Sequence, residues 1–200
     1  MTFGTTPDYL LIGHMTADLT PEGRSPGGTV AYAARTAAAF GLQVGLLTSA
    51  ADSDPLLESL TPYADVVSLP AAETTTYENI YTASGRIQYV RGVAAPIGVR
   101  DIPAHFLGTP LVHLAPIADE VDPQVAHVFK DSMVLLTLQG WLRRWDADGR
   151  VQFKSWFDED VLKSIDVVVY SEEDIPEALG VEAKFAQSVK HLFVTRAEKG

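Results

Sequence analysis

Several short segments of the sequence carry residues whose types and spacing suit the binding of a polyhydroxyl compound or a phosphate. The first is Ser25-Pro26-Gly27-Gly28-Thr29, which runs directly into an alanine-rich stretch. Two glycines before a helix let a ligand approach the backbone, and the amides of the first turn then point at that ligand. Taken alone, a Pro-Gly-Gly segment is more often only a turn.

Asp18 strengthens the case for a ligand site near these glycines. It follows the first apolar run in the segment GHMTAD. An acid that leaves the carboxyl end of a strand lies where open α/β sheets bind ligands. A carboxylate there can accept hydrogen bonds from two hydroxyl groups, which suits a polyol. A capping or solvated aspartate is the equally weighted alternative.

A second candidate segment is Gln139-Gly140-Trp141-Leu142-Arg143, which follows the apolar run 133–138. The amide of Gln139 and the guanidinium of Arg143 could bind hydroxyl or phosphate oxygens at the end of a strand. In the alternative, which is slightly favoured, Trp141 and Trp145 pack against the sheet, and both Arg143 and Arg144 lie in solvent.

Two further segments carry groups suited to phosphate or metal. In Ser171-Glu172-Glu173-Asp174, the serine is a natural N-cap and the acids complement the helix dipole. The functional alternative is that one acid holds Mg²⁺ through water. The tail Val194-Thr195-Arg196-Ala197-Glu198-Lys199-Gly200 could bring a strand end and a glycine-containing turn to a phosphate. The scattered histidines show no metal-ligand spacing, so no directly coordinated metal is expected.

The composition excludes several classes of function. The 200 residues contain 15 Lys and Arg against 26 Asp and Glu, a formal charge of −11, with 46% hydrophobic residues and no cysteine. A nucleic-acid-binding protein normally has a basic face, and an acidic surface repels anionic lipid. The missing cysteines exclude disulfides and a thiol nucleophile. No signal peptide or membrane span is evident, so we expect a cytoplasmic protein with no nucleic-acid or membrane partner.

Short apolar runs that do not alternate with polar residues are typical of parallel strands covered on both faces. Such runs occupy residues 9–12, 44–47, 111–114, 133–138, 165–170 and 192–195. Helices are expected between them, at residues 29–40, 123–130, 158–163, 172–179 and 182–190. The first should end at Gly41, in a left-handed conformation. This alternation predicts a doubly wound α/β sheet.

The segment 74–91 does not follow this alternation of apolar strands and helices. Its sequence, TTTYENIYTASGRIQYVR, is rich in Thr and Tyr, alternates with a period of two and holds a glycine in the middle. These features predict a hairpin, and a polar hairpin inserted in such a domain is more typical of a flap over a site than of the core. Residues 18–24 could add a strand to the same flap. We therefore expect one domain over residues 1–200, with a β lid formed by about residues 14–25 and 74–92.

In this order, the segments resemble the ribokinase-like (PfkB) carbohydrate kinase family over essentially the whole chain. The resemblance covers GHMTAD, SPGGTVAYAARTAAAFGLQVGLLTSAADSD, the flap, SEED in place of Asn-x-x-Glu and VTRAEKG in place of Thr-x-Gly-x-x-Gly. ETTTYENIYTASGR, AAPI and LQGWLR are similar to segments of the myo-inositol kinases within that family. The resemblance implies a three-layer Rossmann-type fold, ATP and Mg²⁺ as cofactors, and a sugar or cyclic polyol as substrate.

The resemblance also implies roles for particular residues. The positions on the substrate side are Asp18, Gly27, Gly28, Tyr32, Gln139 and Arg143. The positions associated with nucleotide and Mg²⁺ are Asp174, Thr195 and Gly200.

Some residues depart from the family pattern. Tyr32 stands where many sugar kinases have Asn, Thr137 replaces an Asp, and Ala197 replaces the first Gly of the phosphate turn. The family's Gly-Ala-Gly-Asp loop, which supplies the catalytic base and an anion hole, should follow the last residue. No catalytic residue is therefore assigned in this chain, and we expect it to be inactive alone, as the N-terminal part of a longer kinase. Losing an oriented base costs about 10²–10⁴-fold in rate.

Two other functions fit the same residues. One is a non-catalytic sugar-binding or interaction module on a kinase scaffold. The other is a nucleoside kinase, in which Tyr32 would stack on the base instead of packing in the core or flap. A homodimer, or poor solubility, is expected because an exposed flap sheet has unpaired edges and an incomplete sheet exposes apolar surface.

Overall fold

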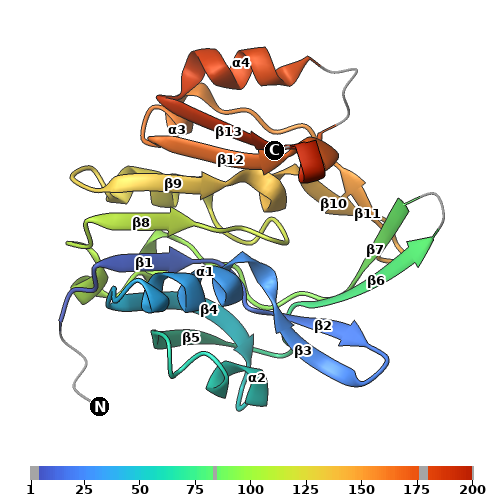
Figure 1. Ribbon diagram of the computed structural model, residues 1–200. Coiled ribbons are helices and arrows are strands. Elements are labelled where there is room, and N and C mark those ends of the chain that lie inside the picture. Colours follow the sequence, from blue (N-terminus) through green and yellow to red (C-terminus); the bar gives the residue numbers. More distant parts are fainter. Residues whose placement is uncertain (1–4, 83–84, 176–179, 200) are drawn as a thin grey trace.

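Parallel strands form the centre of the molecule in the computed structural model, which describes residues 5–82, 85–175 and 180–199 (Figure 1). Seven strands pair, all in parallel, in the order β13-β12-β9-β8-β1-β4-β5. They are β1 (Tyr9–Ile12), β4 (Val44–Ala51), β5 (Asp65–Ala71), β8 (Leu111–Leu114), β9 (Met133–Thr137), β12 (Val167–Ser171) and β13 (His191–Thr195). The doubly wound α/β prediction is confirmed, and each predicted run lies in or overlaps one of these strands. The edge strand β5 was not predicted.

Alternate residues of the strands belong to two separate hydrophobic clusters, one on each face of the sheet. Leu10 and Ile12 of β1 pack in the larger cluster, whereas Leu11 packs in the smaller cluster with α1 (Gly28–Ala39). Because both faces are covered, both sets of side chains must be apolar, which is why the strands are continuous apolar runs. Gly41 follows α1 with φ +81°, the predicted left-handed ending.

The other helices are short. They are α2 (Pro55–Glu58), α3 (Glu159–Leu162), α4 (Val181–Ser188) and the 3₁₀ helices η1 (Val99–Asp101), η2 (Ala104–Phe106), η3 (Pro123–Val128), η4 (Leu138–Leu142), η5 (Glu172–Asp174) and η7 (Ala197–Lys199). None of the helices in the described part of the chain has the length and apolar character that a membrane crossing requires.

Two predicted α-helices are 3₁₀ turns instead. The segment 123–130 forms η3, where the Asp122 carboxylate accepts a hydrogen bond from the Gln124 amide at 2.9 Å. The segment 172–179 begins with η5 and then turns extended at Ile175, with φ −127° and ψ 124°. Ile175 precedes Pro176, and proline disfavours the α conformation in the residue before it. Residues 176–179 of that prediction lie outside the described residues.

A second sheet stands beyond the carboxyl ends of the parallel strands (Figure 1). Its strands lie in the order β3-β2-β6-β7, and they are β2 (Thr16–Thr20), β3 (Gly23–Gly27), β6 (Thr76–Thr82) and β7 (Gly85–Gly92). β6 and β7 pair antiparallel as the predicted hairpin. The single strand expected at residues 18–24 is instead two antiparallel strands. A separate two-stranded sheet, β10 (Arg143–Trp145) and β11 (Val151–Phe153), was not predicted.

One polar network lies inside the main sheet. The Nδ1 atom of His113 on β8 lies 2.7 Å from the Tyr9 hydroxyl, and its Nε2 atom is hydrogen-bonded to the Thr137 hydroxyl. The neutral imidazole accepts one of these bonds and donates the other. Burial lowers the pKa of His113 to about 4, because protonation would place a charge among apolar strands.

We expect the stability of the protein to fall as the pH drops from about 6.5 toward 4, because the unfolded chain then binds a proton at His113 that the folded chain does not. Between about pH 7.5 and about pH 5, this residue alone should cost about 2 kcal/mol. Urea unfolding of the wild type and of His113→Gln at both pH values measures this cost. The variant should lose less stability than the wild type, and an equal loss in the two proteins would contradict the assignment.

Candidate functional site

A cavity of about 330 Å³, here named the inner pocket, lies between the second sheet and the carboxyl ends of the parallel strands. Most of its walls are polar. It is lined by Thr16, Asp18, Gly28, Thr29, Tyr32, Tyr77, Asn79, Tyr81, Arg86, Gln88, Ile117, Gln139 and Arg143. Its volume is in the range of small-molecule sites.

Asp18 projects from β2 into the inner pocket and is half-buried. The Thr16 hydroxyl donates a hydrogen bond to Asp18 Oδ1 at 3.0 Å. Burial raises the pKa of Asp18, while the Thr16 hydrogen bond and the positive charges of Arg143 and Arg86 oppose that rise. The carboxylate thus lies in a pocket that also holds two cationic groups, and it has acceptor capacity left for a ligand.

The glycine pair before α1 leaves room for protein atoms that shape the pocket. A side chain at Gly27 would begin 2.3 Å from Asp18 Oδ2, so the carboxylate has its position only because residue 27 is glycine. At Gly28, which has φ +80°, a Cβ atom would lie 2.8 Å from the His14 carbonyl oxygen. The sequence predicted that these two glycines let a ligand approach the backbone. In the structure, the space beside Gly27 is filled by the Asp18 side chain.

Arg143 is buried, with only 6% of its surface exposed. Its Nη1 donates to the Ile117 carbonyl at 3.2 Å and its Nη2 to Gln88 Oε1 at 3.1 Å. The guanidinium carbon lies 5.4 Å from the centre of the Tyr77 ring. Arg143 begins β10 beside the main sheet, whereas Gln88 and Tyr77 belong to the second sheet, so one cation connects the two sheets.

The sequence alternative that placed both arginines in solvent is wrong for Arg143. Only Arg144 is exposed, since successive residues of a strand point to opposite faces. The same alternative is correct for Trp141, which is fully buried and donates from Nε1 to the Val121 carbonyl at 2.8 Å. Trp145 remains 36% exposed.

The carbonyl that holds Arg143 is itself fixed by a buried carboxylate. Glu120, 4% exposed, accepts hydrogen bonds from the backbone amides of His14, Ile117 and Ala118 at 2.7 to 3.1 Å. It ties the loop after β1 to the loop after β8. The Tyr77 hydroxyl also donates to the Ile117 carbonyl, at 2.6 Å, and burial raises the pKa of Tyr77 to about 12.

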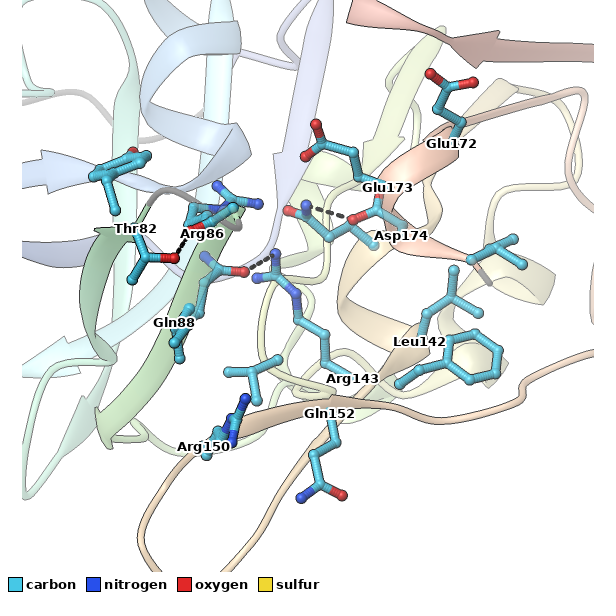
Figure 2. Close-up of a pocket in the computed structure, with 17 residues that line it drawn as sticks. Thr82, Arg86, Gln88, Leu142, Arg143, Arg150, Gln152, Glu172, Glu173 and Asp174 are labelled. Carbon is cyan, nitrogen blue, oxygen red and sulfur yellow. Dashed lines mark hydrogen bonds between the residues drawn. The ribbon is translucent and has the colours of Figure 1, made fainter. Parts of the chain in front are cut away.

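A larger cavity of about 860 Å³, here named the outer pocket, adjoins the inner pocket (Figure 2). The residues shared by the two cavities are Tyr81, Arg86, Gln88, Gln139 and Arg143. Across the outer pocket from β7 lie the acids Glu172, Glu173 and Asp174, as Figure 2 shows.

Both carboxylate oxygens of Asp174 already have partners. Gln139 Nε2 donates to Oδ1 at 2.8 Å, and the Ser171 amide donates to Oδ2 at 2.9 Å. Asp174 therefore orients Gln139 at the boundary between the two pockets. Glu172 lies 3.6 Å from Arg196 and 3.7 Å from Lys199.

The acids of the outer pocket fit a hydrated cation better than a directly caged one. Within the described ranges, no group of three or more His, Cys, Asp or Glu side chains is arranged to hold a metal ion. Glu172 and Glu173 nevertheless offer carboxylates to the outer pocket. Mg²⁺ usually keeps several of its waters and binds through one or two carboxylates.

Most of the residues singled out from the sequence come together. Asp18, Gly28, Tyr32, Gln139 and Arg143 line the inner pocket, Gly27 lies behind Asp18, and Asp174 lines the outer pocket. Thr195 lines neither cavity: it is exposed at the end of β13, and its hydroxyl lies 3.5 Å from the Tyr170 carbonyl. Gly200 lies outside the described residues.

Sequence reasoning missed the residues that the hairpin contributes. Tyr77, Asn79 and Tyr81 alternate along β6, and Arg86 and Gln88 alternate along β7, all lining the inner pocket. Residues two apart on a strand share a face. The period-two pattern of the flap therefore contained the signal that these side chains face one site.

The class of fold follows from comparison with known structures. No family model matches the sequence. A pyrophosphate-dependent kinase in the ribokinase family, complexed with a pyrophosphate analog and myo-inositol, superposes with a TM-score of 0.79 and 20% identity, over 94% of this chain and 72% of its own. Arabidopsis thaliana ribokinase complexed with ribose and ATP has a TM-score of 0.66 and 16% identity, over 98% and 74% of the two chains. The chain thus has the ribokinase-like α/β fold.

A similar sequence is also found among well-characterised proteins. A cytidine kinase of Thermococcus kodakarensis is 26% identical over 211 residues, which cover 96% of this chain and 74% of the relative. The proteins that this chain resembles in sequence or in fold are thus kinases, and the compounds named with them include a polyol, a sugar and a nucleoside.

We expect Arg143→Gln to raise the pKa of Asp18 further, because the substitution removes one of the two positive charges that lower it. It should also cost about 3 kcal/mol of stability, since the Ile117 carbonyl and Gln88 amide lose a charged donor. Carboxyl-carbon NMR titration and urea unfolding measure the two effects. Arg144→Gln is the matched control and should change neither quantity appreciably; equal behaviour of the two variants would contradict the assignment.

Proposed function

We propose that the inner pocket is the acceptor site of a phosphotransferase that acts on an alcohol group, with a sugar or cyclic polyol as the acceptor. Myo-inositol is the first candidate, because a ribokinase-family structure with TM-score 0.79 was determined with it. The enzyme class is a carbohydrate kinase of ribokinase-like type.

The observation that carries the proposal is the polar inner pocket, which combines one carboxylate with cationic and amide groups. Asp18 accepts hydroxyl hydrogens, while Arg143, Arg86, Gln88 and Asn79 offer donors to hydroxyl oxygens. A polyol presents hydroxyls that both donate and accept on every side of a small ring. A pocket whose lining offers both acceptors and donors can therefore satisfy several of them at once.

The outer pocket suits a phosphate donor. Arg86 and Arg143 lie between the two cavities, where a group passing from donor to acceptor must cross. Phosphoryl transfer depends on positioning and on stabilisation of charge over the transferred group. These two cations would hold the phosphoryl oxygens near the acceptor, and the second sheet, acting as a lid, would exclude water.

The donor and the metal complete the proposal. ATP with Mg²⁺ is the donor we infer, and pyrophosphate is the alternative, because relatives of this fold were determined with ATP or with a pyrophosphate analog. When bound, Mg²⁺ neutralises phosphate charge. Glu172 and Glu173 are the residues that would hold it, through its waters.

We assign no catalytic base among these residues. The 200 residues contain no Gly-Ala-Gly-Asp segment, and Asp18 is given the role of binding the acceptor. We therefore propose that this chain, assayed by itself, binds the acceptor without transferring phosphate to it at a useful rate. A homodimer and a cytoplasmic location are part of the same proposal, and sedimentation velocity tests the first.

A nucleoside is the second candidate acceptor. Tyr32 and Tyr81 line the inner pocket yet are 62% and 78% exposed, so neither packs in the core. Exposed aromatic rings at a pocket mouth can stack on a base. The 26% identity to a cytidine kinase favours this candidate, whereas the polar pocket favours a polyol.

Calorimetric titration of myo-inositol, other small polyols, sugars and nucleosides into the wild-type chain tests the acceptor site. We expect one polyol or sugar to bind, and Asp18→Ala to weaken that binding by about 10- to 100-fold, because hydrogen bonds to a charged group are lost. Glu22→Ala is the matched control: Glu22 is an exposed acid in the β2–β3 turn of the same sheet and should leave affinity unchanged. A folded wild type that binds none of the compounds would contradict the proposal.

Substitution of the two exposed tyrosines separates the polyol from the nucleoside. For a polyol, we expect Tyr32→Ala and Tyr81→Ala to change affinity by less than about threefold, since the ligand has no base on which a ring could stack. For a nucleoside, each lost stacking contact costs about 1–3 kcal/mol. Tyr63→Ala, which removes a 39% exposed tyrosine that does not line the pocket, is the control. If Tyr32→Ala or Tyr81→Ala loses affinity for the best ligand and the control does not, the acceptor is a nucleoside and not a polyol.

A further inference from the structure

The short hairpin formed by β10, β11 and their turn lies next to β7 of the second sheet (Figure 1). Its first residue is Arg143, whose guanidinium lines the inner pocket. Its turn is built around Asp146, which accepts hydrogen bonds from the amides of Asp148 at 3.1 Å and Arg150 at 2.9 Å. Gln152 Nε2 donates to the other oxygen of the same carboxylate, at 3.1 Å. The turn thus holds its shape through its own contacts.

The turn of the hairpin is hydrogen-bonded to β7, the edge strand of the second sheet. The Val90 amide donates to the Gly149 carbonyl at 2.8 Å, and Tyr89 and Arg150 form an antiparallel bridge. Val151 packs on the small cluster that includes Val90. The hairpin remains a separate sheet, and its turn is docked on the edge strand of the second sheet through this isolated bridge, the hydrogen bond and the apolar contact.

A further contact comes from a β7 side chain. Arg91 Nη1 donates to the Asp148 carbonyl at 3.1 Å, while its Nε and Nη2 donate to Glu78 of β6 at 2.8 and 2.6 Å. The turn is thereby joined to both strands of the β6–β7 hairpin.

Gly149 lies close against β7. It is buried and has φ +83°, and a Cβ atom there would lie 2.3 Å from the Val90 carbonyl oxygen. Any side chain would push β7 away from the hairpin. Gly23, in the β2–β3 turn of the same sheet, has φ +127°, but a Cβ atom there would have no neighbour within 4 Å. The two glycines share an unusual backbone conformation and differ in what surrounds them.

We propose that this hairpin is a strut that fixes the position of the second sheet over the inner pocket, with Gly149 as a positioning residue. The proposal rests on the proposed function, because it assigns the strut a role in acceptor binding. The base of the strut carries Arg143 and its turn holds β7, which in turn carries Gln88 and Arg86. An acceptor that contacts both Arg143 and the β7 side chains Gln88 and Arg86 strengthens the docking of the turn on β7. By linkage, docking of the turn strengthens acceptor binding by the same factor.

Hydrogen exchange without ligand tests the mechanical part of the proposal. In Gly149→Ala, we expect the amides of β7, Val90 above all, to exchange at least about tenfold faster, whereas those of β8 in the main sheet keep their wild-type rates. Gly23→Ala should leave β7 unchanged. The strut proposal would be overturned if β7 amide exchange became equally faster in both variants, or if it did not become faster in Gly149→Ala. If Gly149→Ala does not fold, Asp146→Ala, which loosens the exposed turn, should accelerate Val90 in the same way.

Calorimetry with the best acceptor found for the wild type tests the coupling. Gly149→Ala should weaken binding by about tenfold and Gly23→Ala by less than about twofold. In the wild type, saturating acceptor should slow Val90 exchange further, and in Gly149→Ala it should not. Equal affinity in the wild type and Gly149→Ala would overturn the coupling. If the wild type binds no compound, the proposed function fails, while the exchange rates still decide whether the strut exists.

Discussion

The rest of the site depends on the burial of the Arg143 guanidinium. A buried cation costs several kcal/mol unless polar neighbours compensate for the lost water. Here the Ile117 carbonyl, the Gln88 amide oxygen and the Tyr77 ring provide that compensation, and Asp18 provides an opposite charge. Gln88, Tyr77 and Asp18 belong to the second sheet, whereas Ile117 lies in the loop after β8. The cation is satisfied only when the second sheet lies close to the ends of the parallel strands, and that arrangement leaves the inner pocket between them.

The charge distribution at this junction differs from that of the whole chain. The formal charge of −11 repels phosphate at long range, yet Arg86 and Arg143 make the boundary between the two pockets locally cationic. Local charges inside a cleft act more strongly than exposed ones, because the low-dielectric walls screen them less. In the function we propose, the pocket with one carboxylate takes the hydroxyl compound, and the boundary with two arginines takes the phosphate.

The elements of the main sheet could be predicted because burial on both faces makes strands continuous apolar runs, as at residues 111–114. β5 was missed because it is a half-buried edge strand that includes Pro70, and proline is tolerated at such edges. Of the site, Asp18 and Arg143 could be predicted from their places after strands. The burial of Arg143 could not, because its partners Gln88 and Ile117 lie 55 and 26 residues away in the sequence.

NMR of the arginine side chains in ¹⁵N-labelled protein measures the burial of the Arg143 guanidinium most directly. Burial predicts that the Arg143 guanidinium gives separate, slowly exchanging Nη protons, because two of its nitrogens are held by Gln88 and Ile117, whereas the exposed Arg144 gives averaged signals. It also predicts that saturating acceptor shifts the Arg143 signals and leaves those of Arg144 in place. Freely rotating, rapidly exchanging Arg143 protons would contradict the account.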